Sequence, residues 1–346
     1  MPNFTEACSP AGDCAPAVSV TEWENPSMQF LKSLQARLKI DPAAVHRIEE
    51  GRRGIEQRLV REVDRLLREA QALRGQRYGS RTLVMGLAAH YGATELAPFV
   101  LSLRQSGYTG DIALLTYGCS AETAEFLRAH RVRMIPFTGL AAMPMSMNSA
   151  RMFRYLDWFI ELFLNAPAEI DYGRILLTDI RDVVFQGDPF ARAPVGRVLF
   201  FLESNRTIGE CAINGDWMTR AYGPAVAREL SDQPVSCAGT VMGTPDGLLE
   251  YLAHMVRDII AVPPQHRFSG VDQAIHNVIL ARRLVEGSVA VENGGTVMTV
   301  PTAESTGLHL LDDGLIANPD GSISAVVHQY DRDAHIRSAI ERRYSA

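Results

Sequence analysis

Apolar and amphipathic segments alternate between residues 82 and 137, and this alternation constrains the fold more than any other feature of the chain. Three short apolar runs are typical of buried strands, and the two segments between them have helical periodicity. In order, the five segments are "TLVMGLAA", "GATELAPFVLSLRQSG", "DIALLTYG", "SAETAEFLRAHR" and "VRMIPF". Strands that alternate with helices predict a mostly parallel sheet in a right-handed α/β fold.

The loop after the first strand is a predicted nucleotide contact. Ligands of parallel sheets bind beyond the carboxyl ends of the strands, and Ala88, Ala89, His90 and Tyr91 lie at such an end. An ordinary exposed loop is the alternative. The chain has neither a GxGxxG sequence after the first strand nor a GxxxxGK[ST] sequence anywhere, so neither a dinucleotide fingerprint nor a P-loop is predicted. Phosphates must be bound in another way.

Composition and charge exclude some partners and leave room for a large core. The chain has 346 residues, of which 47% are hydrophobic, so it is long enough for one large domain or two modest ones. A formal net charge of −6 gives no global attraction to nucleic acid or to an anionic membrane. The first 23 residues lack the pattern of a secretory signal, and no apolar run has the length of a membrane span. We therefore expect a cytoplasmic protein with no membrane span.

Three regions are predicted along the chain. Residues 1–25 lack periodicity and are expected to form a disordered tail. Residues 26–78 are helical and charged, and their last helix has an apolar face. That helical extension either packs on the main domain or forms a surface for homodimerisation or for docking an acceptor. Residues 79–346 form the main α/β domain.

A long amphipathic helix is predicted from about Asn148 to Asn165, with Arg151 and Arg154 in its first turns. Cations at a helix N-terminus oppose the helix dipole, so both arginines are expected to have anionic or hydrogen-bonding partners. A ligand phosphate and internal salt bridges are equally good partners. Of the two, Arg154 is the predicted ligand contact.

The stretch "RILLTDIRDVVFQGDPF", residues 174–190, places Asp179 and Asp182 where an apolar strand ends. Carboxylates at the ligand-binding edge of a parallel sheet suit Mg²⁺ or Mn²⁺, which prefer oxygen ligands and share them with substrate phosphates. The alternative is a pair of salt bridges with Arg174 and Arg181 in an exposed turn.

This stretch resembles the Asp-x-Asp region of glycosyltransferases with the GT-A fold, which use nucleotide sugars. Three later segments match the family in the same order, so the resemblance covers roughly residues 82–332. They are "PVSCAGTVMGT", which resembles the glycogenin-like "FNAGV" strand, "SGVDQAIHNVIL", which resembles the "DQD" helix start, and "VVHQYDR", which resembles the C-terminal strand with its histidine.

The resemblance implies a hexosyltransferase with Mn²⁺ or Mg²⁺ and a nucleoside-diphosphate sugar, best a UDP-sugar, as donor. It implies donor contacts at Gly239 and Thr240, metal ligation by His328, and contacts of Asp272 and Gln273 with the transferred sugar. A pure helix-cap role is the alternative for Asp272. The acceptor, the sugar and the stereochemical outcome are not specified.

Two further site residues are predicted from their positions in the sequence. Arg332 lies beside His328 and is expected to bind phosphate. Glu203 is expected to end another strand at the same edge, where it would bind acceptor or act as a base, or form a salt bridge.

The chain departs from the family by having Asp-x-x-Asp. Either a shifted turn lets Asp182 bind metal with His328, while Asp179 contacts ribose or the metal through water, or Arg181 partly replaces the cation. We favour the first, because Asp182 would otherwise enter a buried strand without a partner. Two other functions stay open: a nucleotidyltransferase, and a non-catalytic scaffold that binds a partner through its N-terminal helices.

Overall fold

Strands and helices in the computed structural model form where the alternation of residues 82–137 predicts them. The structure describes residues 52–75, 78–137, 145–165, 171–263, 266–300 and 307–345, so the predicted tail lies outside the described residues. The first elements are β1 (Arg81–Ala89), α4 (Ala93–Gln105), β2 (Asp111–Tyr117), α5 (Ala121–Ala129) and β3 (Val132–Pro136). Ser120 caps α5, because its hydroxyl accepts a hydrogen bond from the Thr123 N–H.

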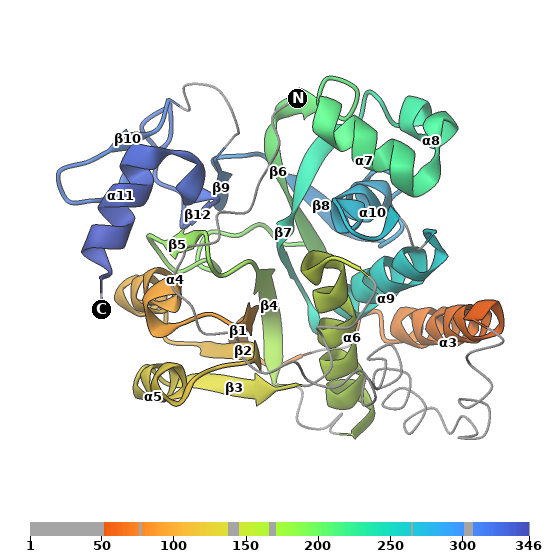
Figure 1. Ribbon diagram of the computed structural model, residues 1–346, viewed down its shortest axis with the longest axis horizontal. Coiled ribbons are helices and arrows are strands. Elements are labelled where there is room, and N and C mark those ends of the chain that lie inside the picture. The colour runs from red at the N-terminus through yellow and green to blue at the C-terminus, as the bar shows by residue number, and fades with distance from the viewer. Residues whose placement is uncertain are drawn as a thin grey trace, which may run out of the picture.

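A seven-stranded sheet forms the centre of the molecule (Figure 1), in the order β3-β2-β1-β4-β7-β6-β8. Its other strands are β4 (Tyr172–Thr178), β6 (Val198–Thr207), β7 (Pro234–Gly243) and β8 (Ser288–Val291). Strand β7 runs antiparallel to both of its neighbours, β4 and β6, whereas the other pairs are parallel. The prediction of an α/β fold with a mixed, mostly parallel sheet is confirmed.

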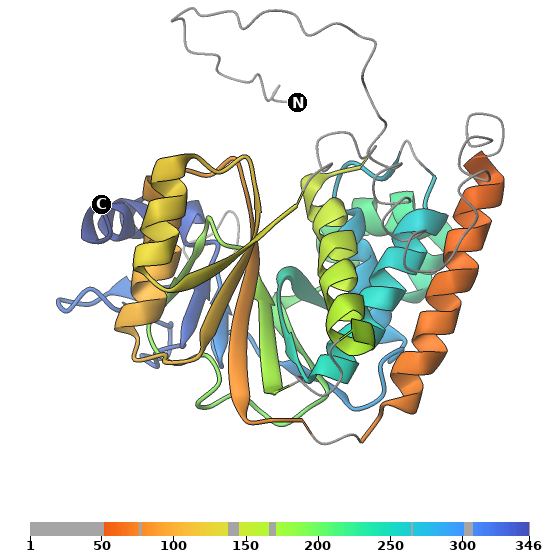
Figure 2. The same ribbon diagram turned by 90° about the horizontal axis from the view of Figure 1, so that it is seen from below.

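Helices cover both faces of this sheet (Figure 2). Helices α4 and α5 pack on one face, against alternate β1 residues such as Val84 and Ala88. The other face of β1, which carries Leu83 and Met85, packs against α6 and α9. The helices that follow α5 are α6 (Met147–Asn165), α7 (Ala212–Tyr222), α8 (Pro224–Glu229), α9 (Pro245–Ala261), α10 (Val271–Ala281) and α11 (Ala334–Arg343).

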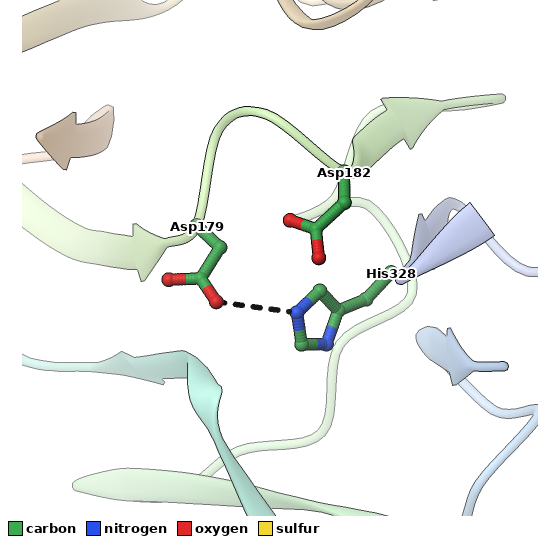
Figure 3. Close-up of side chains that lie close together, drawn as sticks. All are labelled: Asp179, Asp182 and His328. Carbon is green, nitrogen blue, oxygen red and sulfur yellow. Dashed lines mark ion pairs between the residues drawn. The ribbon is translucent and has the colours of Figure 1, made fainter. Parts of the chain in front are cut away.

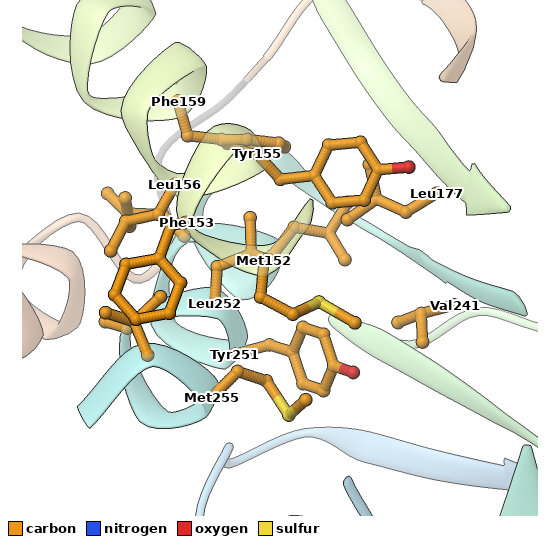
Figure 4. Close-up of a cluster of buried hydrophobic side chains, with 14 of the residues drawn as sticks. Met152, Phe153, Tyr155, Leu156, Phe159, Leu177, Val241, Tyr251, Leu252 and Met255 are labelled. Atoms are coloured by element: carbon orange, nitrogen blue, oxygen red, sulfur yellow. The ribbon is translucent and has the colours of Figure 1, made fainter. Parts of the chain in front are cut away.

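The core between the sheet, α6 and α9 is dense and partly aromatic (Figure 4). Phe153, Tyr155 and Phe159 of α6 meet Tyr251 of α9, and all four are at least 97% buried. Burial of this area stabilises α6 at about 25 cal/mol per Å² of apolar surface removed from water. It also fixes the rotation of α6 about its own axis, and this rotation determines which side chains of its first turns face the carboxyl edge of the sheet.

The predicted helical extension contributes α3 (Arg52–Ala72), which packs on α9. Val63 and Ala70 are buried in the shared core. Asp64 forms an ion pair with Arg257 of α9 at 2.8 Å. These contacts agree with the first of the two interpretations of the extension, a helix packed on the main domain.

A second, three-stranded sheet joins segments that are far apart in the sequence. It consists of β5 (Val183–Phe185), β12 (Val326–His328) and β9 (Val297–Thr299), with β12 in the middle, antiparallel to β5 and parallel to β9. The 3₁₀ turn η4 (Tyr330–Arg332) follows β12. A short hairpin pairs β10 (His309–Leu310) with β11 (Ile316–Ala317). Since β5 directly follows the turn after β4, this sheet brings the C-terminal segment to the carboxyl end of β4.

Among the helices of the described residues, none combines the length and the apolar character needed to cross a membrane.

Candidate functional site

Asp179, Asp182 and His328 converge at the junction of the two sheets (Figure 3). Asp179 directly follows β4, Asp182 directly precedes β5, and His328 ends β12, where it pairs with Val183 of β5. One potential ligand atom from each of the three lies within 4.8 Å of the others. The structure therefore brings together all three residues that the sequence analysis assigned to a metal.

Backbone hydrogen bonds fix the turn that carries the two carboxylates. The Asp179 N–H donates to the Gly239 carbonyl of β7 at 2.7 Å, and the Gln329 N–H donates to the Asp182 carbonyl at 2.7 Å. The backbones of the two residues are thus anchored to different segments, Asp179 to β7 and Asp182 to the residue after β12. These two anchors let Asp179 and Asp182 point toward the same place, although two residues separate them in the sequence. The proposed salt bridges of Asp179 and Asp182 with Arg174 and Arg181 are absent from the described residues.

Gly239 leaves the space in which the cluster forms. A Cβ atom built on this residue would lie 2.5 Å from Cε1 and 2.6 Å from Nε2 of His328, and 2.6 Å from Oδ2 of Asp179. Non-bonded atoms do not approach so closely, so a side chain here would displace His328 or Asp179. Thr240, the other predicted donor contact, is fully buried, and its hydroxyl makes no hydrogen bond within the described part of the chain.

The chemistry of the three side chains fits a divalent cation. His328 is fully buried and its Nε2 makes no hydrogen bond within the described residues, although it lies 3.4 Å from Oδ2 of Asp179. A buried imidazole nitrogen that makes no hydrogen bond is costly unless a ligand satisfies it or, when the ring is protonated, a nearby carboxylate such as Asp179 does. Two carboxylates and one imidazole form a set of hard oxygens and one borderline nitrogen, which suits Mn²⁺ and, with more retained water, Mg²⁺.

Arg151, near the start of α6, connects the carboxylate cluster to α10. Its guanidinium forms ion pairs with Asp179 and, at 3.6 Å, with Asp272, and it donates to the Ala238 carbonyl at 3.2 Å. Arg154 was chosen from the sequence instead. Its guanidinium lies 5.5 Å from the centre of the Phe137 ring, and burial lowers its pKa. The sequence analysis predicted anionic or hydrogen-bonding partners for both arginines, but the rotation of α6 about its axis places Arg151 in the cluster.

A pocket of about 560 Å³ opens beside the carboxylates. Of the residues predicted to bind donor or metal, Ala89, Asp179, Arg181, Asp182 and Arg332 line it. Tyr91, from the loop predicted to contact the nucleotide, lines it too, and further lining residues that the sequence analysis did not assign include Asn148, Arg151, Gln329 and Asp331. The pocket therefore has three arginines and several hydrogen-bonding groups near the cluster.

The loop after β1 contributes unevenly to this pocket. Ala88 is fully buried in the core, and His90 is exposed, with its ring edge-on to Tyr117 at 4.9 Å between centroids. Tyr91 lies in the pocket wall. Burial raises the pKa of its hydroxyl, and the positive charge of Arg181 acts against this increase. Its signal in the sequence was its position, one residue beyond the predicted contact His90.

Asp272 and Gln273 lie in the first turn of α10, behind Arg151. The N-cap of α10 is Gly270, so the alternative that Asp272 is a pure helix cap is wrong. Burial raises the pKa of the Asp272 carboxyl, and Arg151 opposes the shift. The Gln273 side chain accepts from the Ala238 N–H at 2.8 Å and donates to the Ser236 carbonyl at 2.8 Å, so it holds β7.

Glu203 lies inside β6, not at its end as expected, because β6 continues to Thr207. Its carboxylate accepts hydrogen bonds from Asn214 at 3.2 Å and from Gln273 at 3.3 Å. Burial raises its pKa, and nearby Arg332 opposes the shift. A half-buried carboxyl of this kind can exchange a proton nearer to neutral pH than an exposed one can.

No protein-family model matches the chain, and no curated protein matches its sequence. Several solved structures resemble its fold. One is a galactosyltransferase, LgtC, in complex with donor and acceptor sugar analogues, with 15% identity, a TM-score of 0.46, and coverage of 76% of this chain and 96% of that chain. Another is core-mannan synthase A from Aspergillus fumigatus in its Mn/GDP form, with 12% identity, a TM-score of 0.36, and coverage of 60% and 70%.

A third is glucosyl-3-phosphoglycerate synthase from Mycobacterium tuberculosis with Mn²⁺, uridine diphosphate and glucosyl-3-phosphoglycerate, with 13% identity, a TM-score of 0.36, and coverage of 80% of both chains. These similar structures are GT-A glycosyltransferases, the family that the sequence resembles. At such low identities and TM-scores the likeness concerns the fold only, and the argument about function rests on the geometry of the site.

Proposed function

We propose that the chain is a metal-dependent glycosyltransferase that moves a hexose from a nucleoside-diphosphate sugar, best a UDP-sugar, to an acceptor that is not identified. The observation that carries the proposal is the convergence of Asp179, Asp182 and His328 at the carboxyl end of β4, beside a pocket of about 560 Å³. In this proposal residues 79–346 form the catalytic domain, and α3 is a structural part of it.

The charges around the pocket match those that develop in sugar transfer. Cleavage of a sugar–phosphate bond leaves negative charge on the diphosphate, so the site needs cations there. Asp179, Asp182 and His328 would hold Mn²⁺ or Mg²⁺, and the bound ion would supply positive charge to the diphosphate oxygens. Arg332 lines the same pocket and would donate hydrogen bonds to the phosphates.

Residues behind Arg151 act on the sugar end of the site. Asp272 orients Arg151, and Gln273 fixes the backbone of β7 at Ser236 and Ala238, next to Gly239. Glu203, with its raised pKa, is the candidate for proton transfer to or from an acceptor hydroxyl. Gly239 allows the close approach of the donor and the cation to β7.

Calorimetric titration tests this proposal. UDP and GDP are titrated with and without Mn²⁺ into the wild type, Asp182→Asn and Asp216→Asn. Asp216 is an exposed carboxylate paired with Arg220 and serves as the matched control. We expect binding that requires Mn²⁺, is weakened at least tenfold by Asp182→Asn, and is unchanged by Asp216→Asn.

Release of UDP from a panel of UDP-sugars then measures turnover. Nucleotide binding that needs neither Mn²⁺ nor Asp182, or no binding of either nucleotide, would contradict the proposal.

A further inference from the structure

Arg181 lies in the wall between two cavities. The first is the pocket beside the carboxylates, and the second, of about 280 Å³, lies between α4, η4 and α11. Arg181 and Asp331 line both, and their side chains form an ion pair of 3.2 Å. The residue that separates this chain from the Asp-x-Asp pattern thus carries a cation at the boundary of the proposed donor site.

The backbone of Arg181 is fixed, whereas its side chain is exposed. The Tyr330 hydroxyl donates to the Arg181 carbonyl at 3.2 Å, and the next residue, Asp182, accepts from the Gln329 N–H. The Arg181 side chain is 57% exposed, and that of Asp331 is 27% exposed. Ion pairs as exposed as this are weak and exchange partners readily.

The other arginines of the pocket are held more firmly. Arg151 is buried between two carboxylates and a carbonyl, and Arg332 donates to the Val300 carbonyl at 3.2 Å. Within the described ranges, Asp331 is the only ion-pair partner of Arg181. A dianionic diphosphate offers a guanidinium a stronger, bidentate contact than one exposed carboxylate does. Arg181 is therefore the pocket cation that is best placed to move to a ligand.

We propose that Arg181 is a mobile clamp for the diphosphate of the donor, which Asp331 holds to one side until the ligand binds. This inference rests on the proposed function. On binding, the guanidinium exchanges the Asp331 carboxylate for phosphate oxygens, and no covalent bond changes. Asp331 competes with the phosphate oxygens for Arg181, and it keeps the pocket open before the ligand binds. The inserted arginine adds its positive charge to that of the metal and does not replace the metal.

A double-mutant cycle tests the clamp. UDP and inorganic pyrophosphate, each with Mn²⁺, are titrated into the wild type, Arg181→Gln, Asp331→Asn and the double variant. We expect Arg181→Gln to weaken binding about tenfold, because a charge-assisted hydrogen bond is lost. Asp331→Asn should tighten binding about threefold by freeing Arg181. In the Arg181→Gln background, Asp331→Asn should have no effect.

The cycle separates the clamp from a general effect of charge. Removal of a carboxylate near an anionic ligand tightens binding by simple electrostatics, but that gain would be equal in both backgrounds and would overturn the clamp. Wild-type affinity in Arg181→Gln would overturn it as well. Arg220→Gln is the matched control, since Arg220 lines neither cavity and pairs with Asp216 at 2.7 Å. It should leave both affinities unchanged.

The two probes distinguish this inference from the proposed function. If pyrophosphate shows the coupling but UDP and GDP do not bind, the clamp stands and the nucleotide-sugar proposal fails. If UDP binds with Mn²⁺ but without coupling between Arg181 and Asp331, the proposed function stands and the clamp fails. If neither probe binds to the wild type, both are overturned.

Discussion

Gly239→Ala tests whether the space beside β7 belongs to the metal cluster. Gly239 does not adopt the left-handed conformation that favours glycine, so alanine can take its backbone geometry. Any effect must then come from the added methyl group. That group would lie 2.5 Å from Cε1 of His328 and 2.6 Å from Oδ2 of Asp179, about 1 Å closer than ordinary van der Waals contact.

The overlap can be relieved only by moving the His328 ring or the Asp179 carboxylate. Overpacking of a buried position costs about 1–3 kcal/mol, and the reduced freedom of the unfolded chain returns about 0.4–1 kcal/mol. We therefore expect a net loss of stability of about 1–2 kcal/mol. Displacement of a ligand should cost more in function, since changes next to metal ligands lower metal affinity about 10–100-fold.

Manganese titration followed by electron paramagnetic resonance measures the affinity, and urea unfolding measures the stability. Gly187→Ala is the control, because a Cβ at Gly187 would meet only Ala325, at an ordinary distance of 3.7 Å. It should change neither quantity beyond about 0.5 kcal/mol. If Gly239→Ala binds Mn²⁺ as tightly as the wild type while folded, the cluster is not the metal site and the reasoning from its geometry fails.

Two further predictions concern buried charge. Arg197→Met should destabilise the fold by about 3 kcal/mol in urea at pH 7, because among the described residues it leaves the buried carboxylate of Asp246 without an ion-pair partner and that of Glu250 with Arg74 alone; a loss below 1 kcal/mol would show that this network is not structural. Burial lowers the pKa of His276 to about 3. Below about pH 6.5 this histidine is therefore protonated in the unfolded chain, whereas it stays neutral in the folded chain. The free energy of unfolding should therefore decrease as the pH is lowered from 6 to 4. The decrease should be steeper in the wild type than in His276→Gln, by up to about 1.4 kcal/mol per pH unit, and equal slopes in urea unfolding would contradict this.

The first half of the sheet could be predicted because its signals are local. Each of the strands β1, β2 and β3 is a short apolar run between turn residues, and the helices between them have their own caps and periodicity. The antiparallel direction of β7 has no such signal. It depends on how β7 pairs with β4 and β6, which are distant in the sequence.

The candidate site likewise has residues that local sequence signals could predict and residues that depend on long-range packing. The side chains of the cluster could be singled out because residue type and strand ends are local features, as at Asp179 and His328. The choice between Arg151 and Arg154 was not local. Both lie in the first turns of α6, and the aromatic core with α9 sets the roll that turns Arg151 toward the carboxylates. Glu203 was misplaced for a similar reason, since pairing extends β6 beyond the apolar run.

The extra residue of Asp-x-x-Asp does not keep the two carboxylates apart once the turn is seen in three dimensions. Asp179 is tied to β7 through the Gly239 carbonyl, and Asp182 is tied to the segment after β12 through Gln329, so both carboxylates reach the same point despite the extra residue. The turn must then project the intervening Arg181 outward, where it meets Asp331. An Asp-x-Asp turn has one residue fewer between its carboxylates and no arginine at this place. The insertion therefore need not weaken the metal site, and its chemical consequence is a second, movable cation at the edge of the pocket.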